Sequence, residues 1–168
     1  MWTIQQTLVV LKPDAISRSL VWQIISRLER AGLQIVASKM LAPSVEFLRW
    51  HYEGIGQLGT RKWEDLLNKV VEYMRKTPVL AMVVEWVEAV EYVRKIVGST
   101  EPKSATPGTI RWDFAHISYT YADSKSWMSV FNLIHASANL QEAELEIKHW
   151  FNKDEIFKYE LSYSEFIR

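Results

Sequence analysis

The hydrophobic positions of this chain follow two periods, one typical of strands and one typical of helices. Apolar or alternating runs predict strands over residues 7–11, 33–41, 79–85 and 127–135. Apolar residues spaced three and four apart predict amphipathic helices over residues 20–31, 44–52, 63–75, 89–97 and 140–151. Glycine and proline predict loops at residues 54–60 and 99–111.

The order of these elements predicts the class of fold. It runs strand, helix, strand, two helices, strand, helix, long loop, strand and helix. This order predicts an α+β fold of the ferredoxin-like type, a split β-α-β antiparallel sheet with helices packed on one face. No repeat, low-complexity tract or linker interrupts it, so we expect a single domain over residues 1–168.

Composition narrows the functional classes. The 168 residues carry a formal net charge of +0, so no global positive field is available for nucleic acid or an anionic membrane, and neither is expected as a partner. The absence of cysteine excludes disulfides, thiolate metal sites and cysteine nucleophiles. Neither an export leader nor an apolar run of membrane-spanning length is visible, so we expect a cytoplasmic location.

One histidine, His135, is the candidate for covalent chemistry. It closes the apolar part of Asn132-Leu133-Ile134-His135-Ala136-Ser137. A neutral imidazole can attack an electrophilic phosphorus, although a lone histidine at a strand end is more often structural. The other histidines, His51, His116 and His149, lack a phosphate-like setting and a metal-ligand spacing, so they are interpreted as structural or surface residues and no protein metal site is predicted.

Three cations fall at strand ends or turns that the predicted topology gathers near His135. They are Lys12, Arg94 and Arg111. Each alone is more often a solvated surface charge, but phosphoryl transfer depends on cations that accept charge developing on the phosphate oxygens. Arginine adds a planar fork that fits such oxygens. Their combination with His135 therefore favours a phosphate site.

Three further side chains have two interpretations each. The Thr100 hydroxyl donates to a phosphate oxygen or stabilises a turn, and Asn132 binds a sugar hydroxyl or closes a local turn. Glu146 orients the imidazole or is an ordinary solvated glutamate on a helix. Spacing alone does not choose between these alternatives.

Taken together, these residues resemble the nucleoside diphosphate kinase family over nearly the whole chain. The most specific part is Asn132, His135 and Ser137, in the family's Asn-x-x-His-x-Ser setting. The resemblance implies that His135 takes a phosphoryl group from a nucleoside triphosphate and passes it to a nucleoside diphosphate, a ping-pong reaction with broad base specificity. It also implies Mg²⁺ held largely by phosphate oxygens and water, and a homo-oligomer with a hexamer favoured over a tetramer.

The resemblance also implies roles for individual residues. It places Lys12 and Glu146 beside His135 as catalytic residues, with Glu146 orienting the imidazole. The loop over residues 99–111 is expected to line the nucleotide cleft. The positions implied for nucleotide binding are Lys12, Tyr52, Leu66, Arg94, Thr100, Arg111 and Asn132.

The chain departs from the family pattern in three places. Leu66 stands where the family stacks a phenylalanine on the base, with Trp63 one turn earlier as the alternative contact. Ala136-Ser137-Ala138 replaces Gly-Ser-Asp, and Trp112 replaces a glycine. Residues 115–130 are longer than usual by about a hairpin's worth, which predicts a tight turn with two flanking strands that covers the cleft or extends a subunit interface.

Two other functions are compatible with the predicted fold. One is a nucleotide-binding or protein-interaction module without turnover, but a scaffold has no need for His135, Lys12 and Arg111 together. The other is nucleic-acid binding, which the neutral net charge and the lack of paired aromatic strand motifs disfavour.

Overall fold

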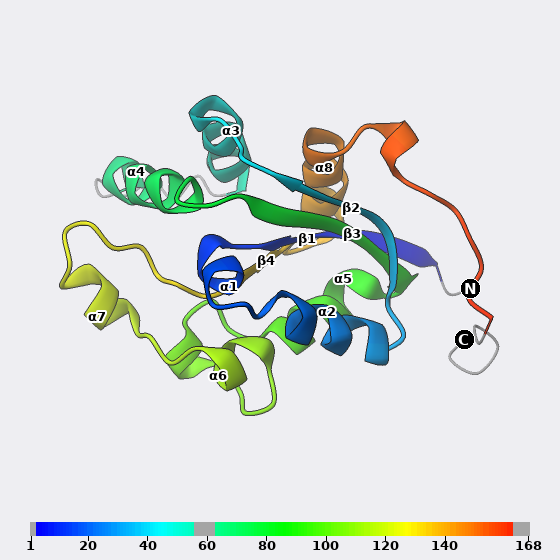
Figure 1. Ribbon diagram of the computed structural model, residues 1–168, viewed down its shortest axis with the longest axis horizontal. Coiled ribbons are helices and arrows are strands. Elements are labelled where there is room, and N and C mark those ends of the chain that lie inside the picture. Colours follow the sequence, from blue (N-terminus) through cyan, green and yellow to red (C-terminus); the bar gives the residue numbers. More distant parts are fainter. Residues whose placement is uncertain (1–2, 56–62, 163–168) are drawn as a thin grey trace.

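Four antiparallel strands form one sheet in the order β2-β3-β1-β4 (Figure 1). The computed structural model describes residues 3–55 and 63–162. This sheet and its helices confirm the predicted ferredoxin-like α+β fold. The strands are β1 (Ile4–Leu11), β2 (Gln34–Leu41), β3 (Val79–Val87) and β4 (Ile134–Ala136).

Helices cover both faces of this sheet, so the expectation that they pack on one face is wrong. In Figure 1, α3, α4 and α8 lie above the sheet, and α1, α2, α5 and α6 lie below it. The described helices are α1 (Pro13–Ser17), α2 (Val21–Arg30), α3 (Val45–Ile55), α4 (Trp63–Met74), α5 (Ala89–Val97), α6 (Ile110–Phe114), α7 (Tyr119–Asp123) and α8 (Leu140–Trp150), with 3-10 turns η1 (Pro102–Ser104) and η2 (Lys153–Glu155).

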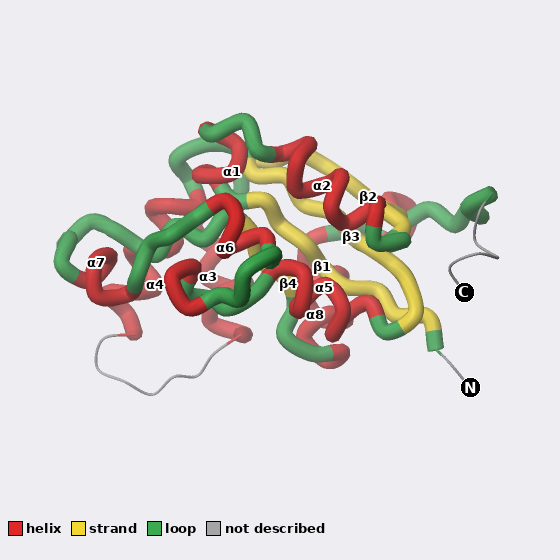
Figure 2. Tube along the Cα trace, turned by 90° about the horizontal axis from the view of Figure 1, so that it is seen from below, coloured by secondary structure: helices red, strands yellow, loops and turns green. Residues whose placement is uncertain are grey.

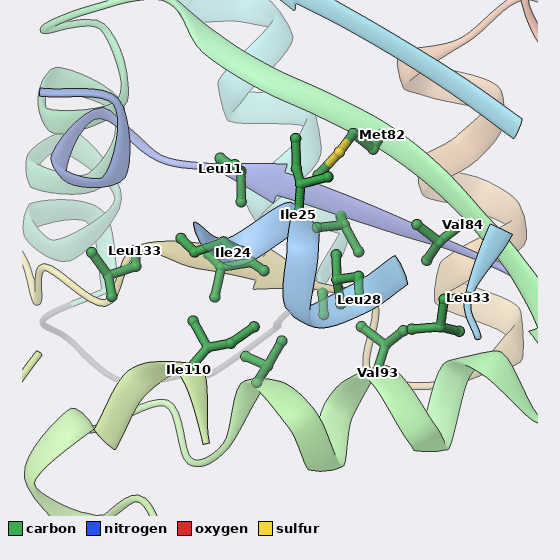
Figure 3. Close-up of a cluster of buried hydrophobic side chains, with 14 of the residues drawn as sticks. Leu11, Ile24, Ile25, Leu28, Leu33, Met82, Val84, Val93, Ile110 and Leu133 are labelled. Carbon is green, nitrogen blue, oxygen red and sulfur yellow. The ribbon is translucent and has the colours of Figure 1, made fainter. Parts of the chain in front are cut away.

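Two hydrophobic cores explain why the sheet is covered twice. Val9 and Leu11 of β1 belong to a core with α2 and α5, whereas Leu8 and Val10 belong to a second core with α3, α4 and α8. Figure 3 shows the first core, where Ile24 lies near Leu11 between helix and sheet. A strand buried on both faces needs a continuous apolar run instead of an alternating one, and β1 has that pattern.

The predictions for residues 115–135 are largely wrong. The strand expected over 127–135 forms only at its end, since β4 begins at Ile134. Residues 115–130 are all described and contain the helix α7 in place of a hairpin. The Ser118 hydroxyl accepts a hydrogen bond from the backbone N–H of Tyr121 at 3.1 Å, which caps a helical turn where a strand was expected.

The chain that follows α7 packs against the end of α4 and not into the sheet. The Phe131 ring stacks on Tyr73 with ring centroids 4.8 Å apart, and Lys76 lies 5.3 Å from the centre of the Trp127 ring. Figures 1 and 2 both place α7 and α4 at the same end of the molecule. These contacts replace the strand pairing that the sequence pattern predicted.

Most of the remaining boundaries agree with the predictions within two or three residues, but β1 begins at Ile4 and not at residue 7, and α6 begins at Ile110, inside the predicted 99–111 loop. The Ser44 hydroxyl accepts from the Phe47 N–H at 3.1 Å and so caps α3, which continues three residues past Tyr52. Of the predicted loop over residues 54–60, residues 54 and 55 belong to α3, and residues 56–60 lie outside the described residues. No described helix has the length and hydropathy needed to span a membrane.

Gly98 ends α5 at a position that only glycine fits. Its φ is +87°, and an added Cβ would lie 2.5 Å from Oγ1 of Thr109. The turn therefore brings the start of the 99–111 loop close to the start of α6.

Candidate functional site

The imidazole of His135 is paired with a buried carboxylate. His135 lies on β4 opposite Val10 of β1, and its Nε2 is 3.0 Å from each carboxylate oxygen of Glu146. Glu146 is only 2% exposed on the inner face of α8, so its interpretation as a solvated glutamate is wrong. An ionised carboxylate only accepts hydrogen bonds, so the proton of a neutral ring lies on Nε2 and the lone pair on Nδ1.

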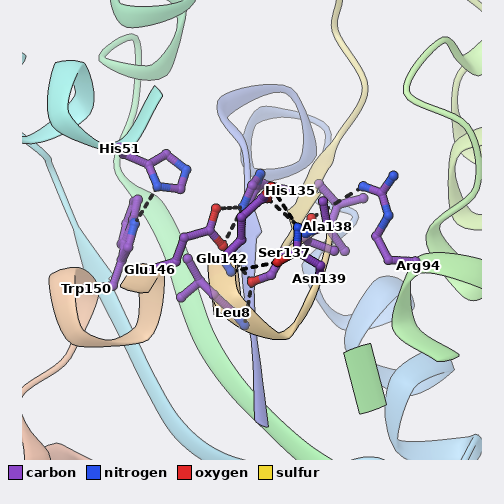
Figure 4. A network of polar contacts seen from close by, with 12 residues as sticks. Leu8, His51, Arg94, His135, Ser137, Ala138, Asn139, Glu142, Glu146 and Trp150 are labelled. Carbon is purple, nitrogen blue, oxygen red and sulfur yellow. Dashed lines mark hydrogen bonds and ion pairs between the residues drawn. The ribbon is translucent and has the colours of Figure 1, made fainter. Parts of the chain in front are cut away.

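Ser137 ties this pair to the central strand. Its hydroxyl donates to Glu146 Oε2 at 2.6 Å and accepts from the backbone N–H of Leu8 at 3.2 Å. The contacts form one chain from β1 through Ser137 and Glu146 to His135 (Figure 4). The imidazole is thus oriented by a network in which Ser137 is fully buried.

Lys12 follows β1 and is nearly buried. It is 9% exposed, and its Nζ donates to Oδ1 of Asn132 at 2.7 Å. Burial, assisted by the positive charge of Arg111 and opposed by Asp14, lowers the pKa of Lys12 to about 7. The interpretation of Lys12 as a solvated surface charge is therefore wrong, and an anion bound nearby would favour its charged form.

Arg111 joins three backbone segments. It is 3% exposed, and its Nε, Nη1 and Nη2 donate to the carbonyl oxygens of Asn132 at 3.2 Å, Gly98 at 2.9 Å and Ile134 at 2.6 Å. Burial and the charge of Arg94 lower its pKa to about 10. A guanidinium has five N–H groups, so two remain for an anion.

Asn132 and Thr100 connect the loop to the site. Asn132 Nδ2 donates to the carbonyl oxygen of Thr100 at 2.8 Å, so Asn132 bridges distant segments and does not merely close a local turn. The side chain of Thr100 is exposed. Arg94 on α5 is half-buried, with Nη1 3.5 Å from the carbonyl oxygen of Ala136. The loop, α5 and β4 thus converge beside His135.

The predicted base-contacting residues lie farther out on the helical hairpin. Leu66 is 42% exposed on α4, while the side chain of Trp63 lies outside the described residues. Their contact with a base stays a prediction. Tyr52 on α3 has a buried Oη without a partner among the described residues, and burial together with Glu146 raises its pKa.

Asp14 is one of the residues that the sequence analysis missed. Its carboxylate accepts from the N–H of Leu133 at 3.0 Å and from the Tyr73 hydroxyl. Leu133 has a φ of 68°, a strained value for a residue with a side chain, and its carbonyl accepts from the Lys12 N–H at 2.8 Å. Asp14 therefore helps to hold a strained residue two positions before His135.

His51 was interpreted as structural or surface, and it lies inside the site. It is 1% exposed, and its ring centroid is 4.7 Å from that of His135. The helical spacing from buried Leu48 to His51 on α3 is a signal that could have placed it inward. The Nε1–H of Trp150 donates to His51 Nδ1 at 3.1 Å.

The donor atoms of His51, His135 and Glu146 lie within 4.8 Å of one another, a spacing that metal sites also use. The hydrogen bond from Trp150 argues for another role. Because His51 Nδ1 accepts that bond, the ring hydrogen lies on Nε2, which then donates and does not ligate. The cluster therefore suits hydrogen bonding to an anion better than metal binding.

Comparisons with known proteins agree with one another. The profile of the family described as nucleoside diphosphate kinase matches residues 5–156. The nucleoside diphosphate kinase of Borreliella burgdorferi is 43% identical over 156 residues, 93% of this chain and 92% of the relative. That of Pyrococcus abyssi is 44% identical over 155 residues, 92% of this chain and 89% of the relative.

Solved structures give the same result. A transition state mimic of the nucleoside diphosphate kinase from Borrelia burgdorferi, with bound vanadate and ADP, aligns with a TM-score of 0.88 at 40% identity, over 96% of this chain and 95% of that chain. An NDP kinase from Pyrobaculum aerophilum aligns with a TM-score of 0.83 at 37% identity, over 93% of this chain and all of that chain.

Proposed function

The chain belongs to the nucleoside diphosphate kinase family, and from this premise we propose that His135 is the residue that carries the phosphoryl group. The protein is a phosphotransferase that moves the terminal phosphoryl group of a nucleoside triphosphate to a nucleoside diphosphate. The observation that supports His135 is its pairing with Glu146 through Nε2, which directs the lone pair of Nδ1 to the reaction.

The reaction divides into two balanced steps. In the first, Nδ1 of His135 attacks the terminal phosphorus, the bond from phosphorus to the bridging oxygen breaks, and the nucleoside diphosphate leaves with that oxygen. The ring then carries positive charge, which the Glu146 carboxylate stabilises through the Nε2–H. In the second step, a terminal oxygen of an incoming nucleoside diphosphate attacks the phosphorus and restores the neutral imidazole.

We propose that the cations beside His135 stabilise the negative charge of the phosphates. Lys12 and the two remaining N–H groups of Arg111 face developing charge on the transferred group, and Arg94 adds a half-buried charge. The Borrelia relative was solved as a transition state mimic with bound vanadate and ADP. We assign the remaining nucleotide contacts to Tyr52, Leu66, Thr100 and Asn132.

The direct test is to trap the intermediate. Protein incubated with terminally labelled ATP should acquire an acid-labile, base-stable label, and a nucleoside diphosphate should then remove the label as a labelled triphosphate. Transfer between nucleotides without any labelled protein would contradict a phosphohistidine path and would point to direct transfer within a ternary complex.

Glu146→Gln is expected to lower kcat by about 10–100-fold, because the amide keeps the shape but loses the charge that stabilises the phosphorylated ring. KM for the nucleotide should change little, since Glu146 touches the imidazole and not the substrate. Steady-state kinetics would measure both. Glu144→Gln on the exposed face of the same helix is the matched control and should retain activity. Equal rates for the two variants would contradict the role of Glu146.

Family members use a divalent metal for nucleotide phosphotransfer, and we propose that the ion here is Mg²⁺. The nearby carboxylates already accept hydrogen bonds from protein donors, Asp14 from Leu133 and Glu146 from Ser137. The surrounding residues therefore fit an ion that is held mainly by phosphate oxygens and water. Mg²⁺ would neutralise phosphate charge, while the chain's own cations position the phosphates.

We also propose a homo-oligomer, with a hexamer favoured over a tetramer. Exposed apolar side chains are available for self-association: Trp22 is 77% exposed, Trp112 is 46% exposed, and Met40 on the edge strand β2 is 58% exposed. Light scattering should give the mass of six chains of 19.7 kDa each. A single-chain mass would contradict the proposal.

Three expectations from the sequence stay predictions. They are the single domain over residues 1–168, the cytoplasmic location, and the interface or cleft role of residues 115–130.

A further inference from the structure

A buried hydrogen-bond donor beside His135 has no acceptor among the described residues. The indole N–H of Trp150 only donates, so Nδ1 of His51 must accept their 3.1 Å hydrogen bond. The hydrogen of the neutral His51 ring is consequently on Nε2. This Nε2 is buried and has no partner within the described part of the chain. Leaving such a group unpaired is costly, which calls for an explanation.

The surroundings of His51 keep it neutral. Burial lowers its pKa well below the ordinary value, and the positive potential of His135, His149 and Lys12 lowers it further. A neutral ring carries a single hydrogen, and Trp150 determines which nitrogen holds it. His51 is therefore a donor of fixed direction and not a second proton carrier.

The direction of this donor follows from the packing of the two rings. The imidazoles of His51 and His135 meet edge to face, with centroids 4.7 Å apart and planes at 78°. Figure 4 shows the His51 ring nitrogen that is not bonded to Trp150 on the side of the ring that faces Glu146 and His135. One ring nitrogen of each histidine and one carboxylate oxygen of Glu146 lie within 4.8 Å of one another.

We propose that His51 is a positioning residue for phosphoryl transfer. Its Nε2–H, held in place by Trp150, directs a partial positive charge at the Glu146 carboxylate and keeps that carboxylate against the Nε2 of His135. The His135 ring is then fixed with Nδ1 toward the phosphorus. This inference rests on the proposed role of His135 as the phosphoryl carrier.

Two substitutions at His51 separate the effect of the Nε2–H donor from the effect of side-chain size. The amide nitrogen of Gln lies near the position of a histidine Nε2, whereas the amide of Asn reaches only the Nδ1 position. His51→Asn should lower the single-turnover rate of protein phosphorylation by about 10–100-fold, as loss of a supporting group behind a catalytic residue does in comparable sites. His51→Gln should recover most of that rate. KM for ATP should stay near that of the unsubstituted protein in both variants.

The imidazole itself provides the second readout. Nitrogen NMR should show His135 with its hydrogen on Nε2 in the unsubstituted protein, and a mixture of tautomers in His51→Asn. Trp150→Phe, which keeps an aromatic ring but removes the indole N–H, should also mix the His51 tautomers and slow phosphorylation. Trp86→Phe, in the core that the sheet forms with α2 and α5 and away from the His135 site, is the matched control.

The outcomes are distinct. Equal phosphorylation rates and an unchanged His135 tautomer in His51→Asn and His51→Gln would overturn the inference, whatever the effect on stability. If either variant fails to fold, Trp150→Phe decides the question through the same two readouts. Failure of this inference alone leaves the unsubstituted protein labelled by ATP, whereas failure of the proposed function leaves it unlabelled.

Discussion

His135→Ala is expected to eliminate the phosphorylated protein and to lower transfer from nucleoside triphosphate to diphosphate by on the order of 10⁵-fold. The reason is that the site has one imidazole in position to attack: His135 has its Nε2 on Glu146, while the neighbouring His51 has its Nδ1 occupied by Trp150. Without the nucleophile, the two-step path is closed, and bound phosphates face only cations. Label incorporation and coupled steady-state assays would measure the two losses separately.

His116→Ala is the matched control for this variant. His116 is exposed on the segment before α7 and is not among the residues assigned to the phosphoryl group or to the orientation of His135, so label and turnover should remain. If His135→Ala still acquired acid-labile label at another histidine, or kept transfer within about tenfold of the unsubstituted protein, the assignment of the carrier would be wrong.

Lys12→Met is expected to lower kcat/KM by about 10²–10³-fold, because methionine keeps most of the stem but removes a buried charge next to the transferred group. The loss should appear mainly in kcat if Lys12 acts on charge that develops in transit. Lys148→Met, at an exposed position of α8, is the matched control. A loss confined to KM would instead assign Lys12 to ground-state binding of the nucleotide.

The same variant should also change the pH dependence of stability. Burial lowers the pKa of Lys12 from 10.5 to about 7. Between these values the unfolded chain binds a proton that the folded chain does not, so the stability of the unsubstituted protein rises with pH in that window. Lys12→Met should therefore gain most in relative stability below pH 7, and the gain should shrink toward pH 10.5. Denaturant unfolding at several pH values would measure this, and a gain that grew with pH would contradict it.

Local patterns predicted much of the architecture. The run over residues 7–11 predicted a strand that ends just before Lys12, and its lack of alternation was a signal for burial on both faces. The spacing of buried Ala143, Glu146 and Trp150 on α8 likewise indicates that Glu146 shares the inner face. Hydrophobic periodicity was sufficient to predict the type of element and its buried face wherever the element was long and its burial followed from its own side chains.

Non-local contacts decided the rest. β4 has only three residues, and its extent depends on pairing with β1 and not on its own pattern. Arg111 donates hydrogen bonds to carbonyl oxygens 13 to 23 residues away, and His51 accepts one from an indole 99 residues away. Such contacts depend on the folded path of the chain. A histidine followed by tyrosine on a helix gives no local sign of such a partner.

The fastening of Arg111 to the backbone of Gly98, Asn132 and Ile134 has a consequence for the direction of turnover. These hydrogen bonds are present without a bound nucleotide. The Arg111 guanidinium therefore needs no rearrangement between the binding of the donor and the binding of the acceptor. Donor and acceptor phosphates then meet the same arrangement of Arg111, although the donor faces a free imidazole and the acceptor a phosphorylated one. Mass action among the available nucleotides alone determines which way the net flux goes.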